Sequence, residues 1–432
     1  MYFYYWSMLQ LAVLRQNPAQ VIERLQHKHL PNAADLVQQI LFADDQRKSI
    51  QAQLDTSLAE QNNLAREIGS LMKAGKQAER EALKIKVAAL KETSKELEQQ
   101  KNDVEQQVQD LLVKLPNLPH SSVPAGKTPE ENEVVYQVAQ LPQLAAEAKP
   151  HWELTSEYGI IDFELGVKVT GAGFPVYKGQ GAKLQRALIN FFLDQNTAAG
   201  YLEVQPPILV NEDSGFGTGQ LPDKEGQMYH ATIDNLYLAP TAEVPVTNLY
   251  RDVILKESDF PVQNTAYTPC FRREAGSYGK DVRGLNRLHQ FDKVEIVELA
   301  HPDKSYAVLE RMRNHVAKLV ESLELPYRIL RLCGGDMSFA SALTYDFEVW
   351  SAAQGRWLEV SSVSNFESFQ ANRLKLRYKA ADGKNYLAHT LNGSAMALPR
   401  IVAAMLENHQ TPHGIRIPKA LVPYTGFEYI TK

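Results

Sequence analysis

Two segments of the chain, TPCFRREAGS at residues 268–277 and RLHQFDKVE at residues 287–295, decide the fold. The first is typical of a strand that ends in an Arg-Arg-Glu sequence. The second is typical of a strand that returns after a loop rich in Gly, Lys and Arg. Hairpin-like neighbours of this kind favour an antiparallel sheet over the parallel sheet of regular strand-helix alternation.

The segments on either side extend this sheet and add helices. We predict strands at residues 204–210, 236–238, 265–271, 290–298, 344–350 and 357–361. Helices are predicted at residues 183–196, 303–323 and 394–408. The expected fold class is α+β, with a mixed, mainly antiparallel sheet flanked by helices.

Composition excludes several classes of protein. The chain has 432 residues, enough for two or three domains, and a formal net charge of −5. That charge excludes nucleic-acid binding through bulk positive charge, although a local basic face remains compatible with it. Cys270 and Cys333 are too few for a disulfide scaffold or a four-cysteine zinc site, and we expect buried thiols. The sequence has no apolar run of 18 residues, so we expect no membrane span and a cytoplasmic protein.

A long helical arm is predicted before residue 116. Between Pro31 and Pro116 there is no proline, and the only glycines are Gly69 and Gly75. Gly75 can supply the left-handed turn that ends a helix, so we expect two antiparallel helices of about 40 residues, each about 60 Å long. Their coiled-coil seam is predicted from the spacing of Leu54, Leu58, Leu64, Ile68, Leu71, Leu83, Val87, Leu90, Leu97, Val104, Val108 and Leu111.

Charge is unevenly distributed along this arm. Residues 66–101 carry nine basic and six acidic side chains, a net charge of +3, whereas the base, residues 34–65 and 102–115, carries −5. A positive distal half suits a phosphate backbone laid along it. From the arm alone, a solvated coiled coil of mixed charge is the simpler interpretation.

Four prolines at residues 116–129 make a stiff connector after the arm. We expect an N-terminal extension at residues 1–7, the arm domain at 8–115, a linker at 116–135 and a catalytic domain at 136–432. The glycines at 171–173 and 179–181 complete neither a dinucleotide fingerprint nor a phosphate loop, so we expect ordinary turns there.

Three motifs in order give the chain a resemblance to class II aminoacyl-tRNA synthetases. The first is Gly200-Tyr201 through Pro207, the second is the arginine-rich segment at 268–295, and the third runs from Asn392 to Arg400. In the third motif, Ala395 and Pro399 stand where the family commonly has glycines. More closely, the chain resembles the bacterial-type seryl-tRNA synthetases from about residue 8 to its end. That resemblance rests on residues 241–243, 271–277, 289–291, 359–362 and 390–394 and on the arm.

The resemblance implies an ATP site built mainly from side chains. Arg272 would hold both the α-phosphate and the amino-acid carboxylate, and Arg287 and Arg400 would hold the γ-phosphate end of ATP. Arg272 and Arg400 are the implied catalytic residues. Phe291 offers a face for adenine, and Glu274 can accept its amino group. Glu359 and Ser362 would coordinate Mg²⁺. The full implied ATP set is Arg272, Arg273, Glu274, Arg287, Phe291, Glu359, Val360, Ser361, Ser362 and Arg400.

The resemblance also implies a pocket for L-serine. Glu295, Thr241 and Ser394 can bond an ammonium and a small hydroxyl, and a site built for a hydroxyl rejects alanine. The implied set is Thr241, Ala242, Glu243, Arg272, Glu295, Asn392 and Ser394. Thr241 and Ser394 can instead be turn and helix-cap residues. His289 suggests a general base, but we expect strand packing there, because the substrate carboxylate attacks unaided in this family.

The implied protein is a homodimer that activates serine with ATP and Mg²⁺ and charges tRNA(Ser). Charging of tRNA(Sec) is left open by the sequence, as is the start at Met1 or Met8. Two alternatives remain at this point: a synthetase-like paralog that loads a protein carrier, and a coiled-coil interaction protein without activity. Such a paralog typically lacks a full arm, and an interaction protein has no use for the motif arginines.

Overall fold

The computed structural model describes residues 9–145, 147–223, 226–274 and 283–432, and the N-terminal extension predicted at 1–7 lies outside them. The chain divides into two compact units. Unit 1 comprises residues 1–26 and 30–116, and unit 2 comprises residues 27–29 and 117–432. In the part of the chain that is described, no helix combines the length and apolarity that a membrane span needs.

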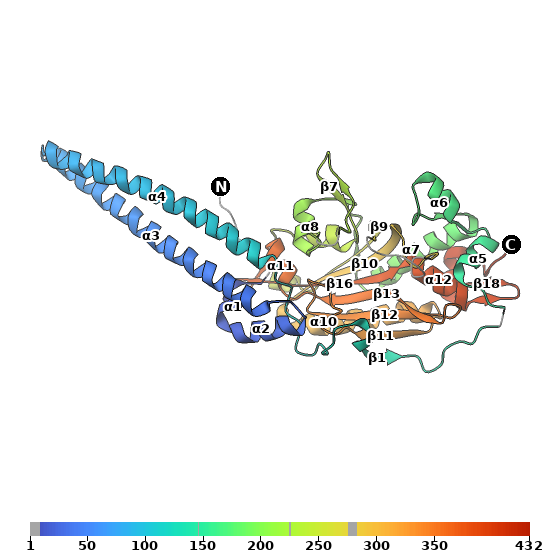
Figure 1. Ribbon diagram of the computed structural model, residues 1–432. Helices are drawn as coiled ribbons and strands as arrows, with labels where there is room; N and C mark the ends of the chain where they lie inside the picture. Colours follow the sequence, from blue (N-terminus) through green and yellow to red (C-terminus); the bar gives the residue numbers. More distant parts are fainter. Residues whose placement is uncertain (1–8, 146, 224–225, 275–282) are drawn as a thin grey trace. The chain divides into compact units, whose positions relative to one another are not determined.

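Unit 1 is helical, and the predicted arm is confirmed. After α1 (Leu11–Gln16) and α2 (Pro18–His27), α3 (Ala33–Lys73) and α4 (Gln77–Leu112) run side by side in opposite directions (Figure 1). They have 41 and 36 residues, and Gly75 between them has a φ of +70°. A residue with a side chain is strained at this φ, which explains the glycine at the arm tip.

The arm seam contains one polar layer that the leucine spacing did not predict. The Oγ atoms of Ser57 and Ser94 lie 2.8 Å apart, and Gln61 Nε2 donates to the carbonyl oxygen of Leu90 at 3.0 Å. Leu58, predicted in the seam, is 43% exposed because Ser57 takes the inward position. Buried polar residues in a coiled coil fix the register of its helices.

At the base of the arm, the buried Asp44 carboxylate is surrounded by cations. Its Oδ2 accepts from Arg15 Nε of α1 at 2.6 Å, and its Oδ1 accepts from Arg47 at 2.7 Å. These bonds outweigh burial and lower the pKa of Asp44. The bond to Arg15 joins α1 to α3.

Unit 2 is built on an eight-stranded sheet with the strand order β1-β11-β12-β13-β16-β10-β9-β4. All neighbouring strands are antiparallel except β4 and β9, so the expected mixed, mainly antiparallel sheet is confirmed. In that order, the strands are Glu133–Gln137, Tyr327–Arg331, Leu343–Ser351, Arg356–Asn365, His389–Ala397, Gln290–Ala300, Val262–Phe271 and Leu202–Glu203.

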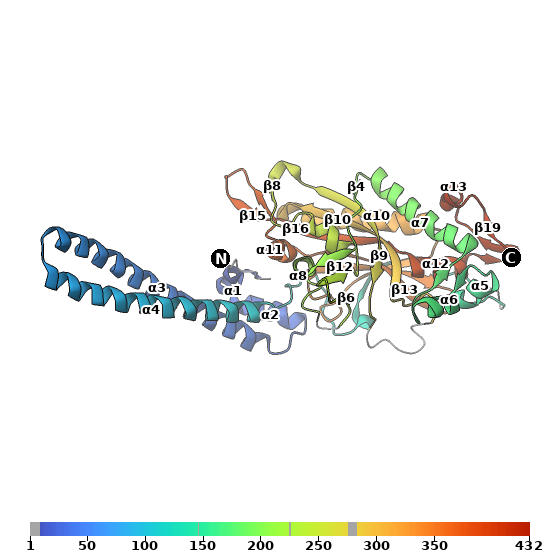
Figure 2. The ribbon, with the colours of Figure 1, turned by 90° about the horizontal axis from the view of Figure 1, so that it is seen from above.

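Three helices pack their apolar sides with one face of this sheet in the main core. They are α7 (Gly179–Ala198), α10 (Ser305–Ser322) and α12 (Leu398–Asn408), and their places over the strands can be followed in Figure 2. The smaller helices are α5 (His151–Glu157), α6 (Phe163–Val169), α8 (Glu212–Thr218), α9 (Glu243–Asn248), α11 (Phe369–Leu374) and α13 (Val422–Thr425).

The remaining strands form small sheets. They are β2 (Ile161–Asp162) with β3 (Val176–Tyr177); β5 (Leu209–Asn211), β7 (Leu236–Leu238) and β6 (His230–Ala231); β15 (Asn385–Leu387), β14 (Arg377–Lys379) and β8 (Ile254–Lys256); and β17 (Gln410–Thr411), β18 (Gly414–Arg416) and β19 (Tyr429–Ile430).

Two predicted elements are wrong. A strand at 204–210 is absent because Pro206 and Pro207 cannot donate to a ladder, and β4 and β5 lie on either side of them. The helix predicted at 394–408 begins at Leu398, since Ser394 lies in β16 opposite Glu295 of β10. Ser394 is therefore not a helix cap, and Pro399 is in the first turn, where proline is tolerated.

Residues 27–29 are held within unit 2 by hydrogen bonds. Lys28 Nζ reaches the carbonyl oxygens of Ser341 (2.9 Å), Phe339 (3.2 Å) and Asn117 (3.5 Å). Burial lowers the pKa of Lys28 to about 7. His27 Nε2 lies 3.0 Å from the carbonyl oxygen of Val123. The chain before the arm is thus bonded to the chain that follows it.

Candidate active site

The expected serine-pocket residues on β10 and β16 lie on the sheet face opposite the main core. Successive side chains of a strand point to opposite faces. On β10, Val294 and Ile296 belong to the core, whereas Lys293 and Glu295 face the other way and contact polar groups. The same alternation on β16 turns Ser394 and Asn392 toward the Glu295 side.

The predicted serine-pocket residues Thr241, Glu295 and Ser394 are brought together. The hydroxyls of Thr241 and Ser394 both donate to Glu295 Oε2, each at 3.3 Å. All three residues are buried. Lys293 Nζ lies 2.6 Å from the same oxygen and is itself buried. Glu295 is thus a buried carboxylate ringed by donors, with one oxygen that takes all the described bonds.

A second carboxyl group, that of Glu243, lies near the first. Burial, followed by the charge of Glu295, raises the pKa of Glu243 to about 7. Gln370 Nε2 donates to Glu243 Oε1 at 2.6 Å. The Asn392 side chain is also buried, and its Nδ2 has no hydrogen-bond partner among the described residues. Ala242, also predicted here, packs in a small apolar cluster beneath α9.

The arginines at the end of β9 face aromatic rings. The Arg272 guanidinium lies 5.4 Å from the centroid of the Phe291 ring, and its Nε donates to the carbonyl oxygen of Pro240 at 3.3 Å. Arg273 lies at the same distance over Tyr229. The arginine and the ring expected to hold phosphate and adenine are therefore neighbours, with Arg272 partly exposed and available to a ligand.

His289 is packed between aromatic residues, as expected. Its ring stacks on Phe174 at 5.4 Å, and its Nδ1 lies 3.0 Å from the hydroxyl of Tyr229. These contacts account for His289 without a role as a base.

The two arginines expected at the γ-phosphate each contact a glutamate of the expected site. Arg287 Nη1 donates to Glu274 Oε2 at 2.7 Å. Arg400 Nη1 donates to the carbonyl oxygen of Glu359 at 2.8 Å and lies 3.7 Å from its carboxylate. Residues 275–277 of the second motif lie outside the described residues.

The acidic end of the site is formed by β12 and β13. Ser362 Oγ donates to Glu359 Oε1 at 3.3 Å, so this predicted pair is adjacent. Asp346 faces Ser362 across the two strands. Burial and the charge of Glu359 raise the pKa of Asp346, and its buried Oδ1 has no hydrogen-bond partner.

Two predicted ATP residues point elsewhere. The Val360 side chain is part of the main core, and Ser361 Oγ donates to the carbonyl oxygen of Ser394 at 2.5 Å. Any contact that Val360 makes with a ligand must therefore come from its backbone.

Three further residues of the site escaped the sequence analysis. Lys293 lies two positions from Glu295 on one strand, so strand alternation alone places both on one face. Asp346 directly precedes Phe347, a core residue, on a predicted strand. Strand alternation therefore places the Asp346 side chain on the face opposite the core. Gln370 reaches Glu243 from α11, and no local pattern signals that approach.

Comparisons with known proteins identify the relatives of this chain. The model of the seryl-tRNA synthetase N-terminal domain matches residues 8–119, and that of the class II tRNA synthetase core domain (G, H, P, S and T) matches residues 229–409. The serine–tRNA ligase of Salinibacter ruber is 50% identical over 98% of this chain and 99% of its own length. The chain belongs to the seryl-tRNA synthetase family. A second member, from Chlorobium luteolum, is 47% identical over 98% of this chain and 99% of its own.

Solved structures of seryl-tRNA synthetases share the fold. The enzyme from Pyrococcus horikoshii, complexed with ATP, superposes with a TM-score of 0.92 at 33% identity, covering 98% of this chain and 99% of its own. A cytoplasmic serine–tRNA ligase from Naegleria fowleri, in complex with AMP, superposes with a TM-score of 0.87 at 24% identity, covering 98% of each chain.

Proposed function

We propose that this chain joins L-serine to tRNA(Ser) in two steps. A carboxylate oxygen of serine attacks the α-phosphorus of ATP, and the bond to the leaving pyrophosphate breaks. A hydroxyl of the 3′-terminal adenosine of the tRNA then attacks the carbonyl carbon of seryl-adenylate, and AMP leaves. Membership of the family over nearly the whole chain favours this reaction over a carrier-loading paralog or an inactive interaction protein.

The observation that carries the proposal is the ring of donors around Glu295. A buried carboxylate attracts the ammonium of an amino acid, and the hydroxyls of Thr241 and Ser394 fit a small polar side chain. Alanine would leave such polar groups unpaired in a buried pocket, which costs free energy.

On the ATP side, Arg272 is placed to hold the α-phosphate beside the serine carboxylate. Its guanidinium neutralises charge that the two anions would otherwise crowd together, and holding them in line supplies much of the rate. Arg287 and Arg400 would exchange their present carboxylate and carbonyl partners for the γ-phosphate end. Phe291 would stack on adenine and Glu274 would accept its amino group.

We propose that Glu359 and Ser362 hold Mg²⁺, with Asp346 beside them. The Oδ1 of Asp346 has no hydrogen-bond partner in the described part of the chain and lies close enough to Glu359 for the charge of Glu359 to raise the pKa of Asp346, so these oxygens fit a divalent cation. Among the described residues no cluster of three or more His, Cys, Asp or Glu could hold a metal by itself. The remaining ligands would therefore come from phosphate oxygens, and the ion, when bound, neutralises charge between them.

The arm is proposed to bind the tRNA body through the basic residues of its distal half. Unit 2 would be the catalytic domain, with proposed domain limits near residues 8–115 and 136–432. The proposed linker between them contributes the first residues of β1 to the sheet of unit 2. We further propose a homodimer, because β4 ends the eight-stranded sheet in a single chain and Leu202 on it is 65% exposed. The proposed location is the cytoplasm, as the family resemblance implies.

Pyrophosphate exchange with each of the twenty amino acids tests the proposal. We expect exchange with serine alone, followed by transfer to tRNA(Ser), with tRNA(Sec) assayed in parallel. A preference for another amino acid would overturn the substrate. Glu295→Ala should raise the KM for serine far more than that for ATP, and an equal effect on both would remove Glu295 from the pocket.

A further inference from the structure

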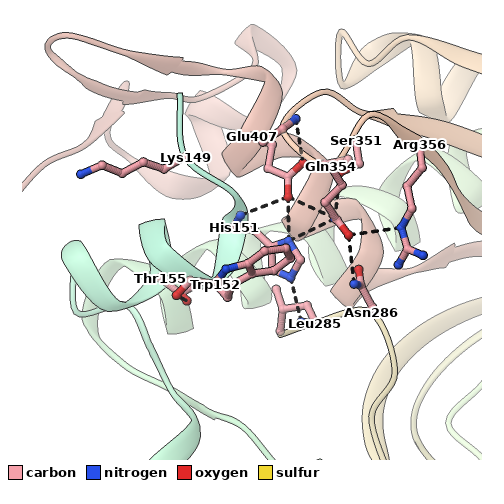
Figure 3. Close-up of polar contacts among 12 residues, drawn as sticks. Lys149, His151, Trp152, Thr155, Leu285, Asn286, Ser351, Gln354, Arg356 and Glu407 are labelled. Atoms are coloured by element: carbon pink, nitrogen blue, oxygen red, sulfur yellow. Dashed lines mark hydrogen bonds and ion pairs between the residues drawn. The ribbon is translucent and has the colours of Figure 1, made fainter. Parts of the chain in front are cut away.

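A buried cluster beneath the expected ATP site is centred on His151, the first residue of α5 (Figure 3). The side chains of His151 and of Glu407 in α12 are both fully buried. The backbone N–H and the Nδ1 of His151 both bond Glu407 Oε1, at 3.0 and 2.8 Å. The ring is thus held from one side by a carboxylate of the main helical layer.

The other side of the ring holds the chain that leads to Arg287. The backbone N–H of Leu285 lies 2.9 Å from His151 Nε2. An amide N–H can only donate, so Nε2 must accept and the ring proton sits on Nδ1. The Nδ1–H group then donates a hydrogen bond to the carboxylate of Glu407. His151 is therefore a neutral imidazole of fixed tautomer that links Glu407 to Leu285.

Glu407 is itself fixed by several donors. Its carboxylate also accepts from the hydroxyl of Ser351, the backbone N–H of Ala353 at 3.3 Å and Gln354 Nε2 at 3.2 Å. Burial opposes ionisation, but the hydrogen bonds from His151 and Ser351 outweigh it and lower the pKa of Glu407. A rigid, ionised acceptor explains why the imidazole has one orientation.

Two further contacts fasten the same segment. The Arg283 guanidinium lies 4.5 Å from the centroid of the Trp152 ring. Gly284 has a φ of +65°, and a Cβ there would lie 2.3 Å from His151 Nε2, so the backbone touches the imidazole. Residues 283–285 therefore rest on the first two residues of α5.

The next residue connects the cluster to the expected triphosphate ligands. Asn286 Nδ2 donates to Gln354 Oε1 at 3.1 Å, and the carbonyl oxygen of Asn286 accepts from Arg400 Nε at 3.0 Å. Arg287 follows directly. One short backbone segment thus carries one triphosphate arginine and orients the other.

We infer that His151, held by Glu407, is a positioning residue for the triphosphate of ATP. It fixes the backbone of residues 284–286 and thereby the placement of Arg287 and Arg400. The inference rests on the proposed function, since it assigns ATP to these arginines. A histidine that only filled the core would need no acceptor turned toward this segment.

Two substitutions of His151 separate its two bonds. In His151→Asn the side-chain amide can still donate to Glu407, but nothing replaces the Nε2 acceptor of Leu285. In His151→Gln the longer side chain brings an oxygen to the Nε2 position. We expect His151→Asn to raise the KM for ATP about tenfold in serine-dependent pyrophosphate exchange, because one buried donor loses its partner. The KM for serine should change less than about twofold, and His151→Gln should restore most of the ATP affinity.

Two controls accompany these variants: the exchange activity of the wild-type protein and a substitution of a second histidine, His315. His315 of α10 is partly buried, and its Nε2 lies 2.7 Å from the Asn196 side-chain oxygen, away from residues 283–287, so His315→Asn should change neither KM. Equal effects of His151→Asn and His151→Gln, or equal rises of both KM values, would overturn the inference. Wild-type protein without serine-dependent exchange would instead contradict the proposed function.

A second variant keeps the inference testable if thermal unfolding shows that His151→Asn does not fold. Gln354→Met removes the partner of the Asn286 side chain and one of the donors to Glu407, but it leaves the bond between His151 and Glu407 in place. The same selective rise in the KM for ATP is expected, and an unchanged KM for ATP would overturn the inference.

Discussion

At the residue scale, Glu243 couples the pocket to pH. Its pKa of about 7 means that the free protein holds a proton there at neutral pH and below. The ammonium of serine favours the carboxylate, so binding serine releases this proton. We expect serine affinity to rise by up to about tenfold per unit as pH increases toward 7, and to level off above it. Calorimetric titration with serine between pH ~5.5 and ~8 measures this slope.

Two substitutions control this prediction. Glu243→Gln should abolish the pH dependence, because an amide does not titrate. Glu298→Gln removes another buried carboxyl with a raised pKa, bonded to Tyr201 away from the pocket, and should leave the slope intact. For folding the sign is opposite: the stabilisation from Glu243 is complete below its ordinary pKa of 4.5 and is lost as pH rises through about 7. A flat affinity profile in the wild type would contradict the prediction.

The ion pair of Lys293 with Glu295 makes a second prediction. Both side chains are buried, so Lys293→Met leaves an uncompensated charge and should lower the free energy of unfolding by about 3–5 kcal/mol. Lys293→Met combined with Glu295→Gln removes both charges and should recover most of that loss, while serine use stays impaired. Urea unfolding checks both values.

Lys384→Met is the matched control for the pair. The Lys384 side chain is 75% exposed, so its removal should change stability by less than about 0.5 kcal/mol. A single Lys293→Met variant as stable as the wild type would contradict the buried-charge argument.

The sequence predicts the three residues that form the centre of the pocket, but it does not predict all of the residues that contact them. Thr241, Glu295 and Ser394 were assigned from family resemblance and do meet at one oxygen. Lys293 was missed although strand alternation points to it. Gln370 could not be found, because its approach depends on how α11 packs, which is a long-range contact.

At the scale of elements, the distal half of the arm can be deleted without changing the rest of the chain. The Oγ atoms of Ser57 and Ser94 are 2.8 Å apart, so a short glycine-rich turn can join α3 to α4 there and replace residues 58–93. Seven basic side chains leave with that segment. We expect serine-dependent pyrophosphate exchange to persist, while the kcat/KM for charging tRNA falls about 100-fold or more.

Exchange activity is the internal control for this excision, because it reports an intact unit 2. The base of the arm keeps the bonds of Asp44 to Arg15 and Arg47, so α1 and α3 stay joined. Undiminished charging by the shortened chain would remove the arm from tRNA binding.

Element boundaries were predicted well where one local signal dominates. The turn follows from Gly75, and the long helices follow from the spacing of their apolar residues. The predicted start of α12 is wrong because residues 394–397 belong to β16, whose pairing with β10 is set by tertiary contact. Pro399 was the missed signal, since a helix starting at 394 would hold it beyond the first turn, where its lost N–H breaks the ladder.

At the scale of the whole molecule, β4 leaves the eight-stranded sheet with an open edge in a single chain. Leu202→Asp places a charge on this edge and should convert the proposed dimer to a monomer, as measured by light scattering after gel filtration. Ile233, 98% exposed between β6 and β7, is the control, and Ile233→Asp should leave the mass unchanged. A wild-type chain that is already monomeric would refute the dimer.

Lys28 and His27 bond the chain at residues 117–123, which bears on how the arm can be replaced during evolution. Residues 30–116 depart from unit 2 and rejoin it at points that are hydrogen-bonded to each other. Topologically the arm is an excursion, like a long insertion at a loop tip. A new helical pair could be grafted at this junction without altering the path of the chain through unit 2, so RNA recognition and serine chemistry are free to diversify separately.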